Sequence, residues 1–88
     1  MTSELQRKAY TAARIAATQY VNLTYKAKMC EGYTEPAFFK IADQSRAEAK
    51  RWLFRFNQKY GQLYSDHGLP QNWGPQDFLE YDNKQPIK

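Results

Sequence analysis

The sequence predicts an all-α protein built on an antiparallel hairpin of two long helices. Its 88 residues are too few to build a second core, so a single domain, residues 1–88, is expected. Apolar residues recur at alternating spacings of three and four through the first 60 positions, which is the period of an amphipathic helix. Gly and Pro occur close together in that region only within residues 31–36, so this stretch marks the turn between the helices.

The first helix is predicted over residues 3–30. Ser3 suits the N-cap, and Gln6 stands where the partner of a capping box would stand. No Pro or Gly interrupts the segment, and its predicted buried stripe is rich in alanine: Leu5, Ala9, Ala12, Ala16, Tyr20, Leu23, Ala27 and Cys30. Because Cys30 ends a buried stripe, we expect its thiol to pack as a small hydrophobe.

The turn is predicted at residues 31–34 and the second helix at residues 35–66. Gly32 suits the left-handed residue that ends a helix, and Thr34 suits the N-cap of the next one. Pro36 falls in the first turn, where a missing N–H costs nothing. Because so short a connection joins two long helices, we expect them to run antiparallel.

The second helix places its bulky residues late in the sequence. Its predicted buried stripe is Phe38, Ala42, Ser45, Ala49, Trp52, Phe56, Tyr60 and Leu63. Gly61 is expected to weaken this helix without ending it, since Gly68 and Pro70 form a firmer stop. In an antiparallel pair, Trp52 and Phe56 should lie over the alanines of the first helix, so that large side chains fill the space left by small ones.

The tail, residues 69–88, is predicted to contain a short third helix that begins at Pro75. A two-helix hairpin cannot bury all the aromatic residues of this chain, so something must cover it. Two arrangements remain open, and they are compatible. The tail could fold back through Trp73, Phe78, Leu79 and Tyr81, or a second copy could dock to form a homodimeric four-helix bundle.

Several classes of site and location are not indicated. No apolar run is long enough to span a membrane and no secretory signal is recognisable, so a cytoplasmic protein is expected. One cysteine and one histidine give neither a disulfide nor a metal site. The four glycines are too dispersed for a phosphate-binding loop, so no cofactor is expected.

Asp43 and Glu48 each precede an arginine by three residues and are expected to form surface ion pairs. No catalytic residue is indicated, so the chain is not expected to be an enzyme.

Basic and aromatic residues together suggest a binding surface. The net charge is +4, and aromatic residues make up 16% of the chain. On the second helix the candidate partner-binding residues are Lys50, Arg51, Phe54, Arg55 and Lys59, and on the first helix they are Tyr10, Arg14 and Tyr25. Arginine and aromatic residues are concentrated at interface hot spots, and they also suit phosphate contact with base stacking. The simpler alternative is a solvated helix face with its aromatics covered by the tail.

The sequence therefore supports three hypotheses of function. The first is a non-catalytic protein-binding module, an adaptor or an inhibitor of the kind that a phage or other mobile element encodes. The second is a small nucleic-acid-binding protein, against which stand the modest charge and the lack of a recognisable helix-turn-helix or basic arm. The third is a structural subunit of a larger assembly.

Overall fold

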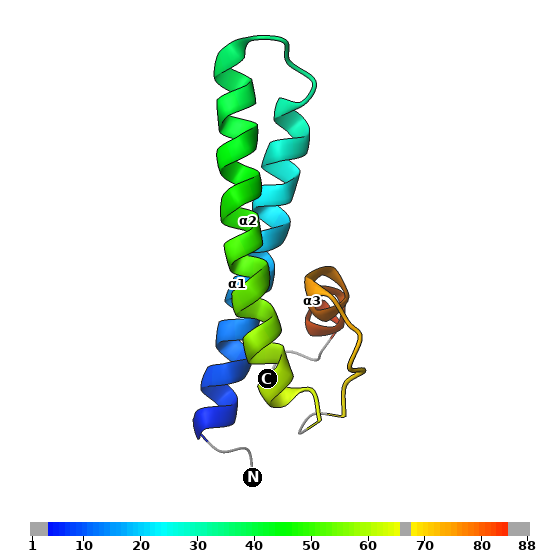
Figure 1. Ribbon diagram of the computed structural model, residues 1–88. Coiled ribbons are helices and arrows are strands. Elements are labelled where there is room, and N and C mark those ends of the chain that lie inside the picture. The colour runs from blue at the N-terminus through cyan, green and yellow to red at the C-terminus, as the bar shows by residue number, and fades with distance from the viewer. Residues whose placement is uncertain (1–3, 66–67, 85–88) are drawn as a thin grey trace.

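The computed structural model describes residues 4–65 and 68–84 (Figure 1). This part of the chain contains three helices: α1 (Glu4–Cys30), α2 (Pro36–Leu63) and α3 (Pro75–Asn83). The all-helical prediction is confirmed, with two long helices that pack together. The predicted capping pair of Ser3 and Gln6 lies outside the described residues and side chains, as does the predicted end of the second helix at residue 66.

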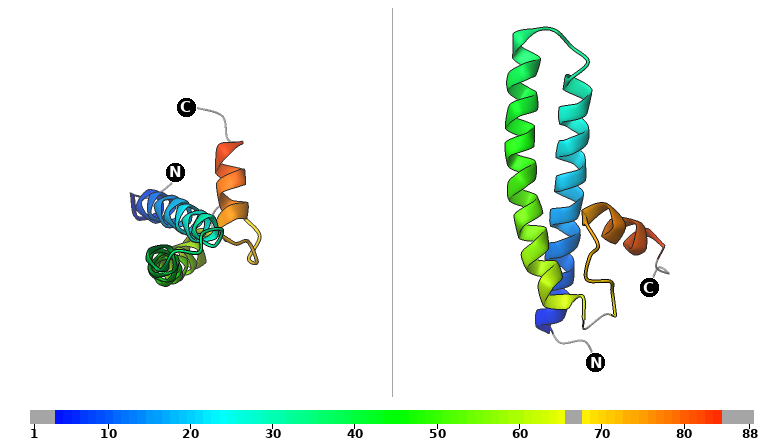
Figure 2. Two further views of the ribbon diagram at one scale, coloured as in Figure 1. Left: turned by 90° about the horizontal axis from the view of Figure 1, so that it is seen from above. Right: turned by 45° about the vertical axis from the view of Figure 1, so that its right-hand side comes forward.

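The molecule is elongated because its two long helices lie side by side. They run in opposite directions and give the molecule extents of 53 × 23 × 21 Å. The shorter α3 lies at one side of this pair and points away from it, beside the half of α1 that is farther from the α1–α2 connection (Figure 2). It contacts α1 more extensively than α2. One side of the pair is therefore covered along part of its length by α3.

The connection between α1 and α2 differs from the prediction in two details. Gly32 is not left-handed, and its N–H instead donates to the carbonyl of Met29 over 3.4 Å, which continues the right-handed turn. Thr34 is not the N-cap of α2, because Glu35 holds that position without a side-chain hydrogen bond. Pro36 begins α2 as predicted. Tyr33 stacks on the ring of Phe38 in the first turn of α2, with 4.3 Å between the ring centroids. This contact fixes the entry of the chain into the helix.

The turn that follows α2 is closed by a glycine five residues after the helix ends. α2 passes through Gly61 as predicted, and it ends at Leu63, before the predicted residue 66. Gly68 has a φ of 66°. Its N–H donates to the Ser65 carbonyl over 3.3 Å, and the next N–H, that of Leu69, donates to the Tyr64 carbonyl over 2.7 Å. These two bonds form the Schellman pattern, which requires a left-handed residue and turns the chain back toward the helix pair.

The core follows the predicted stripe on α2 more closely than on α1. On α2 all eight predicted residues are buried or half-buried, with Phe38 and Trp52 in the half-buried class. On α1 the prediction was wrong for Leu5, which is 79% exposed, and it missed Ala13 and Ala17, which are fully buried. The stripe on α1 is wider than one partner helix requires because α3 covers these two alanines from the other side.

The tail folds back through Phe78, which is fully buried. Its ring lies 5.2 Å from that of Tyr10, 5.7 Å from that of Phe56 and 5.8 Å from that of Tyr60, measured between centroids. The Tyr10 hydroxyl donates to Asp82 Oδ1 over 2.6 Å, and the Tyr60 hydroxyl donates to the Pro70 carbonyl. Three rings from the two long helices and one from α3 thus form a single aromatic cluster with its hydroxyl groups satisfied.

Candidate interaction groove

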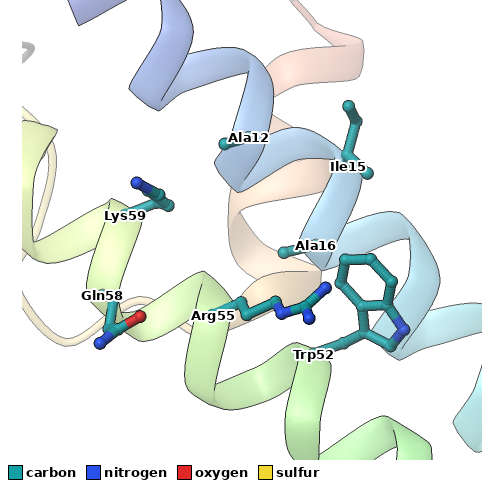
Figure 3. A pocket seen from close by; sticks show the side chains of 7 residues that line it. All are labelled: Ala12, Ile15, Ala16, Trp52, Arg55, Gln58 and Lys59. Carbon is teal, nitrogen blue, oxygen red and sulfur yellow. The ribbon is translucent and has the colours of Figure 1, made fainter. Parts of the chain in front are cut away.

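The side of the helix pair turned away from α3 carries an open groove of about 380 Å³ (Figure 3). From α1 it is lined by Ala12, Ile15 and Ala16. From α2 it is lined by Trp52, Arg55, Gln58 and Lys59. We call this side the open face, and the side that carries Tyr10, Ala13 and Ala17 beneath α3 the covered face. No described residue of α3 reaches the groove.

Helical geometry explains why two faces exist. On α1 the residue that contacts α2 is Ala16. The covered residues Ala13 and Ala17 lie on one side of it, and the groove residues Ala12 and Ile15 lie on the other. Because alanine is small, α2 can approach α1 closely along this line. Ile15 is 48% exposed, and Leu5, seven residues before Ala12 and therefore on the same side of α1, is more exposed still. The open face thus presents apolar side chains to solvent on its α1 side.

The α2 side of the groove is built around a cation on an aromatic ring. The guanidinium carbon of Arg55 lies 4.7 Å from the centroid of the Trp52 ring. Figure 3 shows Arg55 extending along α2 toward the indole, which itself reaches over to α1 beside Ala16. A cation over the face of an indole is attracted by its ring quadrupole, so each side chain holds the other in place. Trp52 is packed against the core as predicted, but it is only half-buried.

The cations of this half of α2 lack carboxylate partners within the described residues. Arg46, nearer the α1–α2 connection, pairs with Glu31 and, over 3.1 Å, with Asp43 as the sequence predicted. The predicted pair between Glu48 and Arg51 is not formed, and none of Lys50, Arg51, Arg55 and Lys59 makes an ion pair with a described residue. The positive charge along the groove is therefore available to a partner.

The candidate residues on α2 lie on two adjoining sides of the helix. Arg55 and Lys59 line the groove. Arg51 precedes Arg55 by one turn and continues the same row, while Lys50 and Phe54 lie farther round on the outer surface. Phe54 is 64% exposed. These five residues therefore form one continuous surface on α2, with Phe54 at its outer edge.

The candidate residues on α1 are separated from that surface, and Tyr25 is also distant from Tyr10 and Arg14. Tyr10 belongs to the covered face, where burial and the bond to Asp82 raise the pKa of its hydroxyl well above the usual value. Arg14, one turn later, is exposed near that hydroxyl and opposes the rise in the pKa. Tyr25 is 65% exposed but lies near the end of α1 at Cys30, more than two turns beyond the groove residue Ala16. The structure does not bring these three residues together with those on α2.

Sequence reasoning did not identify Trp52 and Ile15 as parts of a surface. The α2 stripe predicts Trp52 wholly in the core. Ile15 lies outside the predicted stripe of α1, and a large apolar residue in that position is itself a signal of a second contact surface. The α1 stripe predicts Ala12 in the core, but it lies half-buried in the groove.

Other kinds of site find little support in the described part of the chain. Its His, Cys, Asp and Glu side chains form no group of three or more that could hold a metal ion. Cys30 is buried, as expected for a thiol that packs as a hydrophobe. None of the three described helices combines the length and apolarity that crossing a membrane requires. Searches against known protein families, curated proteins and solved structures find no match to this chain.

Proposed function

We propose that this chain is a non-catalytic protein-binding module, of the adaptor or inhibitor type, that docks the open face of its helix pair on a larger protein. The observation that carries this proposal is the groove between Ile15 and Trp52, exposed to solvent and bordered by the unpaired Arg55. Trp and Arg are the residue types that dominate interface hot spots, and an exposed apolar groove with a charged border is typical of a contact surface.

Phe54 and Arg51 extend the proposed contact beyond the groove. No element of the described part of the chain covers Phe54, which is largely exposed, and Arg51 lies between it and the groove. A partner seated in the groove could bury both, which would bring the contact closer to the area that a specific interface needs. The module would then act by occupying the surface of its partner, since nothing in the groove provides a nucleophile beside a base.

The experiment is affinity purification of the tagged protein, compared with two charge reversals. Arg55→Glu changes the groove, and Lys40→Glu makes the same change of charge near the other end of α2. Both side chains are exposed, so both variants should keep the helicity and the melting temperature of the wild type. The proposal predicts that Arg55→Glu loses a protein partner that Lys40→Glu retains.

Two results would contradict this function. If the two variants retain the same partners, the open face is not the binding surface. If capture is abolished by nuclease treatment and restored by adding nucleic acid, the cations contact phosphates and the chain is a nucleic-acid binder, with an affinity that falls steeply with salt.

A further inference from the structure

The groove also restricts what its occupant can be. We infer that it receives an acidic amphipathic helix, whose apolar stripe packs between α1 and α2 and whose carboxylates lie along α2. This inference rests on the proposed function and adds the chemistry of the partner. Three observations support it: the spacing of the cations on α2, the apolar lining of the groove on α1, and the poor fit of a second copy of the chain.

The cations lie on one border of the groove at a helical repeat. Arg51, Arg55 and Lys59 follow one another at intervals of four residues and extend over about 12 Å of α2. An adjacent helix with carboxylates four residues apart matches this spacing turn for turn. Arg55 is already oriented by the Trp52 ring, so its remaining N–H groups can bind a carboxylate at little cost in side-chain entropy.

Apart from Gln58, the rest of the groove is lined by apolar side chains. Ala12 and Ala16 form its floor on the α1 side, beside the exposed Ile15. Small residues between two helices leave a depression into which the side chains of a third helix can pack, as in a helical bundle. Phosphates would satisfy the cations but would leave Ile15 and the face of α1 uncovered. The pairing of an apolar side with a basic side therefore favours an amphipathic helix over a nucleic-acid backbone.

A second copy of the chain fits this groove poorly. Two open faces brought together would place the arginines and lysines of both copies in one interface. The acidic helix α3 has the right charge, with Asp77 and Glu80 exposed, but its Phe78 is fully buried on the covered face. Its Leu79 and Tyr81 are half-buried against the same core, so the solvent side of α3 offers no full apolar stripe to a groove. The occupant must therefore come from another protein.

The test uses the fluorescence of Trp52 to report binding in the groove. The chain has two tryptophans, so in a Trp73→Phe variant the indole emission comes from the groove alone. The probe is a synthetic helical peptide of about 18 residues, roughly 27 Å long, with a stripe of Leu and a row of Glu along one side of it. Two control peptides keep the Leu stripe with Gln in place of Glu, or keep Glu with Ser in place of Leu.

The inference predicts that only the Leu and Glu peptide binds tightly and shifts the emission of Trp52 to shorter wavelength. Replacing Glu by Gln, or reversing Arg55 and Lys59 to Glu, should weaken binding by about tenfold or more. The Trp52→Phe variant is the matched control, because its remaining indole, Trp73, lies beside Tyr81 near α3 and should not respond.

Each other outcome overturns the inference. Equal binding of the Gln peptide would show an apolar groove with no preference for acid. A shift that rises with protein concentration alone would show that a second copy occupies the groove, and a shift produced by an oligonucleotide would show a phosphate site. If no peptide binds while Arg55→Glu still abolishes capture of the protein partner, the acidic helix is wrong but the proposed function stands. If capture is also unaffected, both fail.

Discussion

Both the covered face and the open face of the helix pair carry aromatic side chains, but they differ in how the described residues satisfy their polar groups. On the covered face the rings of Tyr10 and Tyr60 both contact that of Phe78, and both hydroxyls donate hydrogen bonds. On the open face Trp52 is half-buried, and the Arg55 guanidinium lies over the Trp52 ring without a carboxylate partner among the described residues. The comparison indicates that one set of aromatic residues stabilises the fold while the other remains available for contact.

The largest effect is expected on the covered face. Phe78→Ala removes a fully buried ring from the centre of the aromatic cluster, and it should lower the free energy of unfolding by about 3 to 5 kcal/mol. A domain of this size has roughly 4 to 13 kcal/mol in total, so the variant should be close to unfolding. Chemical denaturation followed by circular dichroism measures the change. A loss below about 1 kcal/mol would show that α3 does not hold the fold together.

A smaller effect is expected for the equivalent truncation on the open face. Trp52→Ala removes a half-buried ring, and the area already exposed contributes nothing to stability, so we expect a loss of about 2 kcal/mol. The same denaturation experiment provides the measurement. If Trp52→Ala proves as costly as Phe78→Ala, the groove belongs to the core and the distinction between the two faces disappears.

The covered face should also respond to alkali. Burial raises the pKa of Tyr10 and of Tyr60 above the usual value near 10, helped by the Asp82 carboxylate at Tyr10 and by the charge of Asp77 at Tyr60. Below pH 10 these hydroxyls keep their protons in both states. Above it the unfolded chain releases them first, so stability should fall as the pH rises.

Tyr10→Phe isolates the contribution of one hydroxyl to this pH dependence. At neutral pH the variant loses the bond to Asp82 and should be destabilised by about 1 to 2 kcal/mol. Between pH 10 and 12 its stability should decline less than that of the wild type, because one of the two tyrosines can no longer ionise. Parallel curves for the two proteins over that range would contradict the assignment.

The smallest effect is expected at Phe54. This ring is exposed on the outer surface of α2, so Phe54→Ala should change the free energy of unfolding by no more than about 0.5 kcal/mol. The proposed function predicts that the same variant binds its partner less tightly. A marked loss of stability would indicate that Phe54 is covered in solution, for instance by a second copy of the chain.

The fold was predictable because its main signals are local in sequence. The period of three and four residues, Pro36 and Pro75 all act within one or two turns, and the two prolines begin α2 and α3 as expected. The glycine signals were less accurate, because Gly32 is not left-handed and α2 ends at Leu63, before Gly68. Which helix side would be covered depends instead on where the tail packs. The burial of Ala13 and Ala17 and the exposure of Leu5 are set by contacts that are distant in sequence, and the stripe on α1 could not reveal them.

The same reasoning explains why the candidate site was only partly predicted. Arg51, Arg55 and Lys59 could be selected because charge on a helix outside its apolar stripe is readable from the sequence. Tyr10 lies outside the predicted apolar stripe of α1, where an exposed contact residue would also lie. Only the contacts with Asp82 and Phe78, which are distant in sequence, show that it is covered. Trp52 was missed for the opposite reason, since a residue on the apolar stripe can still lie at the border of the core.

The central claim is that the two faces have different functions, and a titration by nuclear magnetic resonance tests it most directly. The isotope-labelled wild-type protein is mixed with the Leu and Glu peptide, and the backbone amide and indole signals are followed residue by residue. The account predicts chemical shift changes at Ala12, Ile15, Ala16, Trp52 and Arg55, with the signals of Phe78 and its neighbours in α3 unchanged. Binding of the peptide with changes concentrated on α3, and none on the open face, would contradict it.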